Sequence, residues 1–392
     1  MHRMFLGAAI APLLILANPA QARPGPDGWT PAWTASMWQA NQPAQRVSVE
    51  NATLRMQVRV GAAGSKIRIR LANDYGPAMR IGAATVRIAG GKPVRVTFDG
   101  QAEGKLRNAA PLVSDAVALP VKQFDLIEVS LYMPDKVDID TVHGANGAKT
   151  KISPNGDFTE KDFTALLQSG PRPLLAQIDV LAPKPRPVIV AYGDSITDNV
   201  GCANEAVPVC RWGDVLGRRL AAAGMPHVVV TQAIGGNRIL SSGSGPNALA
   251  RFDRDVLALP GVTHVVMLEG INDIGGSGRN NGPVVTVEDL KSGYRQIVQR
   301  AHAHGIKVIG LTILPFEGAG YQTPAGEAMR TEINNWILTS GTFDAVVDLQ
   351  KSVADPANPK RLASALQGGD NLHPNGAGET KMGEAIPLSL FK

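Results

Sequence analysis

Two short segments carry the side chains that serine-based acyl transfer needs. Gly193-Asp194-Ser195 places a hydroxyl directly after an apolar run, and Asp370-Asn371-Leu372-His373 places an imidazole close to a carboxylate. A carboxylate that accepts from Nδ1–H leaves Nε2 free to take the proton of the serine. The sequence therefore predicts Ser195 as nucleophile, His373 as its base and Asp370 as the group that orients the base. A serine that only caps the next helix is the ordinary alternative.

Two further segments could bind the negative charge that develops on the carbonyl oxygen. Gly235-Gly236-Asn237 would let a main-chain N–H approach an oxyanion closely, and Gly270-Ile271-Asn272-Asp273 offers a side-chain amide. Taken singly, each has a simpler explanation as a turn glycine or as an Asn that holds its own turn. Gly235 and Gly236 both fit the glycine position.

One other histidine competes for the role of the base. His143 follows Asp140 with the same Asp-x-x-His spacing, but it lies in a strand-rich region far from the serine segment. We expect it to line the cleft at most. The remaining histidines fall in the first residues, at the starts of predicted strands or at the end of a predicted helix, where a cation suits the helix dipole.

Alternating strands and helices in the second half of the chain would bring these segments together. Apolar strands are predicted at 187–192, 227–233, 264–269, 307–313 and 345–348, and helices at 211–223, 287–303, 325–339 and after Pro374. This alternation predicts an α/β fold with a parallel sheet and helices on both faces. Ligands bind beyond the carboxyl ends of such strands, where the serine, glycine and Asn segments all lie.

The region before this sheet has a different pattern. Short stretches of alternating polar and apolar residues are found at 53–60, 66–71, 84–88, 94–98 and 126–131, with turn residues between them. They predict an antiparallel β-sandwich of jelly-roll type. The Pro-rich segment 181–187 resists both helix and sheet, so we place a domain boundary there. The predicted domains are residues 23–182 and 183–392.

Residues 1–22 have the pattern of a signal peptide. Arg3 precedes an apolar run over 4–17, and Ala20-Gln21-Ala22 offers small residues for cleavage. The run is too short to span a bilayer comfortably, although a retained anchor is the alternative. We therefore expect a secreted or periplasmic protein without stable membrane insertion. Export favours a disulfide between the two cysteines, Cys202 and Cys210, over two free thiols.

Charge and composition exclude several partners. The formal charge of +5 becomes +4 once Arg3 is removed with the leader (+5 − 1), and the basic residues form no stripe, which argues against nucleic acid. Two cysteines cannot form a zinc cluster, and the chemistry predicted above needs neither a metal nor an organic cofactor. The oligomeric state is left open.

The four motifs, in this order, resemble the sequence blocks of SGNH (GDSL-type) hydrolases over about residues 188–390. The resemblance implies a flavodoxin-like, three-layer α/β/α fold. It implies an oxyanion hole formed by the N–H of Ser195, the N–H of Gly236 and the amide of Asn272, with His373 and Asp370 completing the triad. The front region resembles the jelly-roll-like domain that precedes the SGNH domain in some secreted members, and related architectures occur among carbohydrate deacetylases.

We therefore expect a carboxylic ester hydrolase for short acyl groups, with O-acetyl esters on a small molecule or polysaccharide favoured. The segments 241–247 and 275–282 are polar and Gly-rich, and no apolar lid segment is evident. Trp29, Trp33 and Trp38 could stack on sugar rings, although packing is the more usual role. The alternatives are a short-chain lipase, arylesterase or thioesterase with the same triad, and an inactive carbohydrate- or surface-binding protein.

Overall fold

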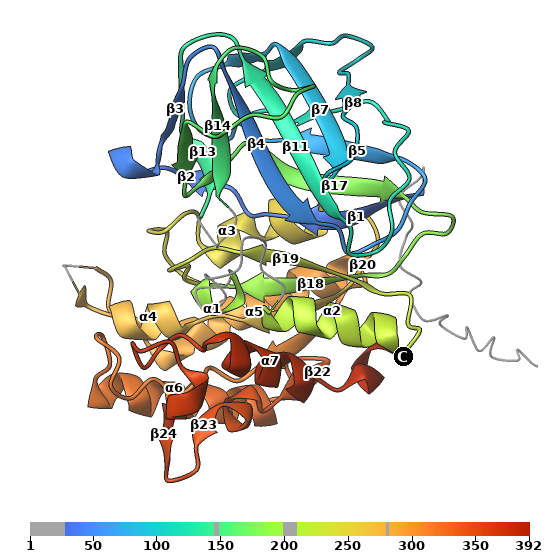
Figure 1. Ribbon diagram of the computed structural model, residues 1–392. Helices are drawn as coiled ribbons and strands as arrows, with labels where there is room; N and C mark the ends of the chain where they lie inside the picture. The colour runs from blue at the N-terminus through green and yellow to red at the C-terminus, as the bar shows by residue number, and fades with distance from the viewer. Residues whose placement is uncertain (1–27, 145–148, 199–209, 280–281) are drawn as a thin grey trace, which may run out of the picture.

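The computed structural model describes residues 28–144, 149–198, 210–279 and 282–392 (Figure 1). Up to Leu181 the chain forms antiparallel sheets, and from Val188 onwards it forms a parallel sheet with helices. The predicted leader and Cys202 lie outside the described residues. Within them, no helix is both long enough and apolar enough to cross a membrane.

The second half is built on a five-stranded sheet with the order β19-β18-β20-β21-β22, in which all neighbours are parallel, as predicted. Its strands are β18 (Val188–Gly193), β19 (Val228–Ala233), β20 (Val262–Leu268), β21 (Lys307–Leu311) and β22 (Ala345–Val347). The chain moves from β18 to β19 on one side and then crosses to β20 on the other. The topological switch point therefore lies at the carboxyl ends of β18 and β20, where a ligand crevice is expected.

Helices cover this sheet in two groups. The helices are α1 (Ser195–Asp198), α2 (Trp212–Ala222), α3 (Ala248–Phe252), α4 (Ile271–Gly276), α5 (Val287–Ala303), α6 (Pro324–Thr339) and α7 (Gly376–Ala385). α2 packs against α7, and α5 packs against both α3 and α6. The last helix begins two residues after Pro374, because the side chain of Asn375 accepts from the N–H groups of Ala377 and Gly378 and so caps it.

The front region is antiparallel, as predicted, and contains two larger sheets. A four-stranded sheet is formed by β1 (Trp29–Thr34), β17 (Leu175–Leu181), β5 (Ile67–Leu71) and β10 (Leu112–Val113). A six-stranded sheet is formed by β15 (Leu167–Ser169), β14 (Thr150–Asn155), β4 (Ala52–Arg59), β11 (Leu126–Met133), β7 (Ala83–Ile88) and β8 (Val94–Val96). Trp29 and Trp33 lie in β1, a stretch for which no strand was predicted.

Shorter strands complete the chain. A three-stranded sheet is formed by β16 (Arg172–Pro173), β13 (Thr141–His143) and β2 (Trp38–Gln39). Two-stranded pairs are β3 (Val47–Val49) with β12 (Val137–Ile139), β6 (Met79–Ile81) with β9 (Gly104–Leu106), and β23 (Ala354–Asp355) with β24 (Asn358–Leu362). Only the last pair belongs to the second half.

The two halves pack directly on each other. Figure 1 shows the antiparallel strands above the parallel sheet, with β1 beside β19. Thr34 Oγ1 donates to the main-chain oxygen of Thr231 at 2.9 Å, and Arg254 of the second half bonds Asp74 and the main-chain oxygen of Met37. The buried apolar residues of both halves form one continuous cluster. The front region therefore forms part of the surroundings of the carboxyl ends of the parallel strands.

Candidate active site

A tight turn after β18 presents Ser195. β18 ends at Gly193 and α1 begins at Ser195, and the N–H groups of Thr197 and Asp198 donate to the main-chain oxygen of Asp194 at 3.1 and 2.9 Å. Only glycine fits before this turn, because a Cβ at position 193 would lie 2.1 Å from Thr197 Oγ1. The hydroxyl is thus held at the carboxyl end of the sheet in a residue that is 8% exposed.

The structure brings the three predicted triad residues into contact. Ser195 Oγ lies 2.8 Å from His373 Nε2, and His373 Nδ1 lies 2.5 Å from Asp370 Oδ2. The other oxygen, Oδ1, accepts the main-chain N–H groups of Leu372 and His373 at 3.0 and 2.9 Å. Gly368 N–H donates to the main-chain oxygen of His373, which fixes the loop. In this arrangement Nδ1 donates to the carboxylate and Nε2 can accept the serine proton.

The environment of Asp370 keeps its carboxylate charged. Burial acts to raise the pKa of Asp370, but the main-chain N–H of His373, its imidazole and the N–H of Leu372 together outweigh burial, so that the pKa is lowered. A carboxylate that stays ionised stabilises the imidazolium formed when His373 takes a proton.

Asn272 is oriented from both ends of its amide. It lies in α4, directly after β20, and its Nδ2 donates to the main-chain oxygen of Asn237 at 3.0 Å. Tyr321 approaches Asn272 Oδ1 with its hydroxyl at 3.3 Å. An amide nitrogen carries two hydrogens. One hydrogen is therefore left for a ligand, and its direction is fixed.

Both candidate glycines lie in the turn after β19. A Cβ at Gly235 would lie 3.9 Å from Ser195 Cβ, which places this residue beside the nucleophile. Gly236 has a φ of +75°, a left-handed conformation that favours glycine, and a Cβ there would lie 2.7 Å from Ser244 Oγ. The geometry explains why residue 236 is glycine but leaves both N–H groups as candidate donors.

Buried acids lie near a buried arginine behind the site, and no sequence motif indicated the contacts of that arginine. Arg251 is 2% exposed and contacts Asp255 and Glu269 at 3.1 and 3.2 Å. Burial raises the pKa of Asp194 to about 7, with the charge of Asp273 adding to the effect. Burial also raises the pKa of Asp273 to about 6, although the N–H groups that its carboxylate accepts work against this.

His143 contacts a carboxylate that lies three residues after the serine. It is 4% exposed, and its Nε2 lies 3.0 Å from Asp198 Oδ1 at the far end of α1. Among the tryptophans, Trp29 and Trp33 pack against the guanidinium groups of Arg68 and Arg172 at 4.6 and 5.0 Å. Such packing leaves those two rings as poor platforms for a sugar.

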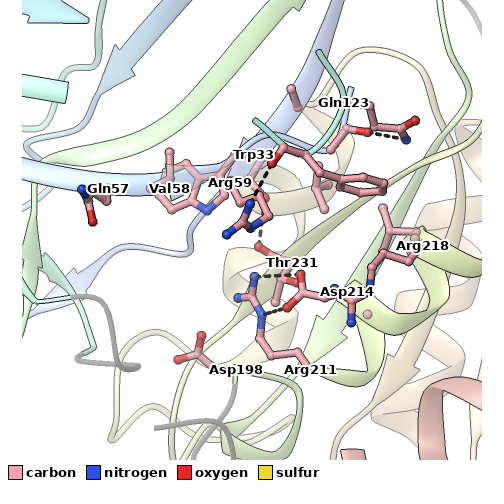
Figure 2. Close-up of a pocket in the computed structure, with 18 of the residues that line it drawn as sticks. Trp33, Gln57, Val58, Arg59, Gln123, Asp198, Arg211, Asp214, Arg218 and Thr231 are labelled. Atoms are coloured by element: carbon pink, nitrogen blue, oxygen red, sulfur yellow. Dashed lines mark hydrogen bonds and ion pairs between the residues drawn. The ribbon is translucent and has the colours of Figure 1, made fainter. Parts of the chain in front are cut away.

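A cavity of about 60 Å³ lies between the front region and α2 (Figure 2). Figure 2 shows Arg59 reaching in from the front region, and Arg211 paired with Asp214 on the opposite wall. Among the described residues that line this cavity, Asp198 and His143 are present and Ser195 and His373 are not. It is therefore distinct from the serine–histidine contact.

The part of the chain that the structure describes contains no group of three or more His, Cys, Asp or Glu residues placed to hold a metal ion. Because Cys202 falls outside that part, its pairing with Cys210 stays a prediction.

Comparison with known proteins identifies the second half. Residues 191–381 match the model of the "GDSL-like Lipase/Acylhydrolase family". No curated protein matches the chain. Among solved structures, the acetyl xylan esterase AlAXEase is 21% identical, with 50% of this chain and 96% of that chain covered and a TM-score of 0.40. A GDSL-like lipase from Bacteroides thetaiotaomicron is 20% identical, with 52% of this chain and 87% of that chain covered and a TM-score of 0.39. TesA is 22% identical, with 51% of this chain and 95% of that chain covered and a TM-score of 0.40.

Proposed function

Because residues 191–381 form a GDSL-like lipase/acylhydrolase (SGNH) domain, we propose that the protein is a serine esterase that uses Ser195, His373 and Asp370. The observation that carries the proposal is the 2.8 Å contact between Ser195 Oγ and His373 Nε2. A nucleophile within hydrogen-bond distance of a base that is itself oriented by a carboxylate is the arrangement that acyl transfer needs.

The proposed reaction has two steps. His373 Nε2 accepts the serine proton while Ser195 Oγ attacks the ester carbonyl carbon, and the carbonyl oxygen becomes negatively charged. The alcohol leaves with the proton from His373, and an acyl group remains on Ser195. Water then gives a proton to His373 and attacks the acyl carbon; the bond to Ser195 Oγ breaks, His373 passes that proton to the serine oxygen, and the acid is released.

Three donors on three neighbouring loops support stabilisation of the oxyanion. We assign the main-chain N–H groups of Ser195 and Gly236 and the free N–H of Asn272 to this role. None of these main-chain N–H groups donates to another described residue. Donors that are fixed before the reaction need no reorganisation when charge develops, which is why such groups contribute strongly to catalysis.

The substrate is proposed to be a short acyl ester, with O-acetyl groups on carbohydrate favoured. The support is the polar loop over residues 241–247, held in place by Asn237 Nδ2, which donates to the main-chain oxygens of Ser244 and Pro246. Trp38 is half-buried and lies beside Gly245 of this loop. A polar wall next to an aromatic ring suits a sugar better than a long acyl chain.

A substrate panel tests this proposal. Acetate release from acetylated xylan and pectin is measured beside turnover of nitrophenyl esters of rising chain length, for the wild-type chain and for Ser195→Ala. We expect the acetyl esters to be turned over fastest and the variant to be inactive although folded. An optimum at long acyl chains, a preference for thioesters, or sugar binding without turnover would each replace the proposed substrate class.

A further inference from the structure

A second buried histidine–aspartate contact joins the front region to the helix that begins at Ser195. His143 ends β13, and its Nε2 lies 3.0 Å from Asp198 Oδ1. Its Nδ1 lies 2.9 Å from the main-chain oxygen of Ser36. A carbonyl oxygen can only accept, so Nδ1 is the donor to Ser36, and Nε2 shares a proton with the Asp198 carboxylate. The imidazole therefore connects Ser36 with α1.

Asp198 is rigidly connected to the nucleophile. Ser195 opens α1 and Asp198 lies three residues further along it, and the N–H of Asp198 donates to the main-chain oxygen of Asp194 at 2.9 Å. Asp198 is 3% exposed. Because the two residues share one helical turn, a movement of Asp198 is transmitted to Ser195 and changes its distance from His373.

Ser36 makes a second connection between the halves. Its side chain is fully buried, and its hydroxyl donates to Gln232 Oε1 of β19 at 2.7 Å. Ser36 Oγ in turn accepts from Arg251 Nη1 at 3.2 Å. The segment between β1 and β2 therefore reaches the arginine that lies behind the site.

Arg251 ties together the ends of three parallel strands. Its Nη2 donates to the main-chain oxygen of Gly193 at 2.9 Å and to Glu269 Oε1 at 3.2 Å. Its Nη1 donates to the main-chain oxygen of Gln232 at 3.0 Å, and its Nε donates to Asn237 Oδ1 at 2.8 Å. These partners lie at the ends of β18 and β19 and just after β20. Each loop that carries a proposed oxyanion donor is therefore held by one guanidinium.

We propose that Ser36 and His143 are positioning residues for ester hydrolysis, so that the front region completes the active site. The proposal rests on the proposed function, because the groups they position are the nucleophile and the oxyanion donors. His143 acts through Asp198 on Ser195. Ser36 acts through Arg251 on the loops after the strands. Each residue therefore acts through a neighbour, and neither is assigned a contact with the reacting atoms.

The expected effect is on turnover and not on substrate binding. Misplacing reacting groups by 1 Å costs on the order of 100-fold in rate. His143→Ala removes one partner of the buried Asp198 carboxylate, and with it the connection between α1 and Ser36, so kcat should fall about 10- to 100-fold with KM nearly unchanged. His143→Gln keeps an amide donor for Asp198 and should recover part of the loss. Ser36→Ala should lower kcat in the same direction.

Thr34→Val is a matched control. Thr34 lies on β1, is 3% exposed and makes one hydrogen bond between the halves, from Oγ1 to the main-chain oxygen of Thr231. The valine keeps the shape but loses this bond, which contacts neither α1 nor Arg251. Thr34→Val should therefore lower Tm slightly and leave kcat unchanged.

The full-length variants are compared by kcat and KM on nitrophenyl acetate, by the rate of phosphonylation with a fluorophosphonate, and by Tm. The proposal predicts that kcat and the phosphonylation rate fall by the same factor within His143→Ala, and likewise within Ser36→Ala. His143→Gln should be intermediate between His143→Ala and the wild type, and Thr34→Val should match the wild type. If His143→Ala does not fold, His143→Gln and Ser36→Ala carry the comparison.

Two results would overturn the positioning role and leave the proposed function intact, provided that the wild type hydrolyses esters and Ser195→Ala does not. The first is that folded His143→Ala and Ser36→Ala both keep the wild-type kcat. If His143→Ala does not fold, His143→Gln takes its place in this test. The other is an equal loss in Thr34→Val, which would reduce the effect to general packing of the two halves. A wild-type chain that hydrolyses no ester and is not phosphonylated would instead overturn the proposed function, and the positioning role with it.

Discussion

Replacing Asp370 with Asn should harm turnover more than replacing it with Ala, although Asn is the closer mimic. Oδ1 accepts two main-chain N–H groups, from Leu372 and His373. In the Asn variant the amide oxygen is expected to keep these bonds, which turns the NH₂ group toward His373 Nδ1. Nδ1 then becomes the acceptor and Nε2 carries the proton. An imidazole in that tautomer cannot take the proton of Ser195.

The size of the difference follows from what it costs to turn the amide round. Turning the amide loses two main-chain hydrogen bonds, which are worth about 1 kcal/mol each. The side chain of residue 370 is 49% exposed, so water replaces part of that loss. The amide orientation that enforces the wrong tautomer of His373 is therefore preferred by about 1–2 kcal/mol, so kcat of Asp370→Asn should be roughly 5- to 30-fold below that of Asp370→Ala. In Asp370→Ala residue 370 does not contact the imidazole, so either tautomer can form. Both variants should fall below the wild type.

The assay is kcat of the three chains on nitrophenyl acetate, with Tm measured to show that each is folded. The expected order of kcat is wild type, then Ala, then Asn. An Asn variant as active as the wild type would mean that Asp370 does not orient His373. An Asn variant clearly better than Ala would mean that the main-chain contacts do not fix the direction of the amide.

Two further predictions concern the oxyanion donors and the buried acids. Asn272→Ala should lower kcat by about 10²–10³ with KM little changed, because one donor to the oxyanion is lost. Tyr321→Phe removes only the 3.3 Å contact that orients the amide, so its kcat should fall much less. Equal losses of kcat in the two variants would argue against the assignment of Asn272 as a donor. Because burial raises the pKa of Asp194 to about 7, the folded chain binds a proton there that the unfolded chain releases near pH 4, so this group's share of stability is lost as pH rises from about 4 through 7. Asp194→Asn keeps an oxygen for the N–H of Ile196 and should have a higher Tm than the wild type at pH 8, with the gap closing at pH 5; a gap that does not change with pH would contradict this.

The parallel sheet was predictable from the sequence because its strands are mostly apolar and alternate with helices. Val188–Gly193 is buried along its whole length, and the helix over 287–303 was predicted with its observed bounds. Since parallel strands end at one edge, the positions just after three strands indicated where Ser195, Gly236 and Asn272 would meet. The front region was less predictable, because β1 does not alternate between buried and exposed residues.

The contacts behind the site could not be predicted from spacing. Arg251 lies on a helix of only five residues, yet it bonds residues that come from three different strand ends. His143 was recognised only as a second Asp-x-x-His, and its true partner, Asp198, lies 55 positions along the chain. Long-range polar contacts of this kind depend on how the two halves pack, which no local pattern encodes.

Peptide mapping after reaction with a fluorophosphonate tests the role of Ser195 most directly. We expect one adduct per chain, on the peptide that contains Ser195, with esterase activity lost in proportion to labelling, and no adduct in Ser195→Ala. An adduct on another serine, or full ester hydrolysis by a chain whose Ser195 is fully labelled, would contradict the assignment of Ser195 as the nucleophile.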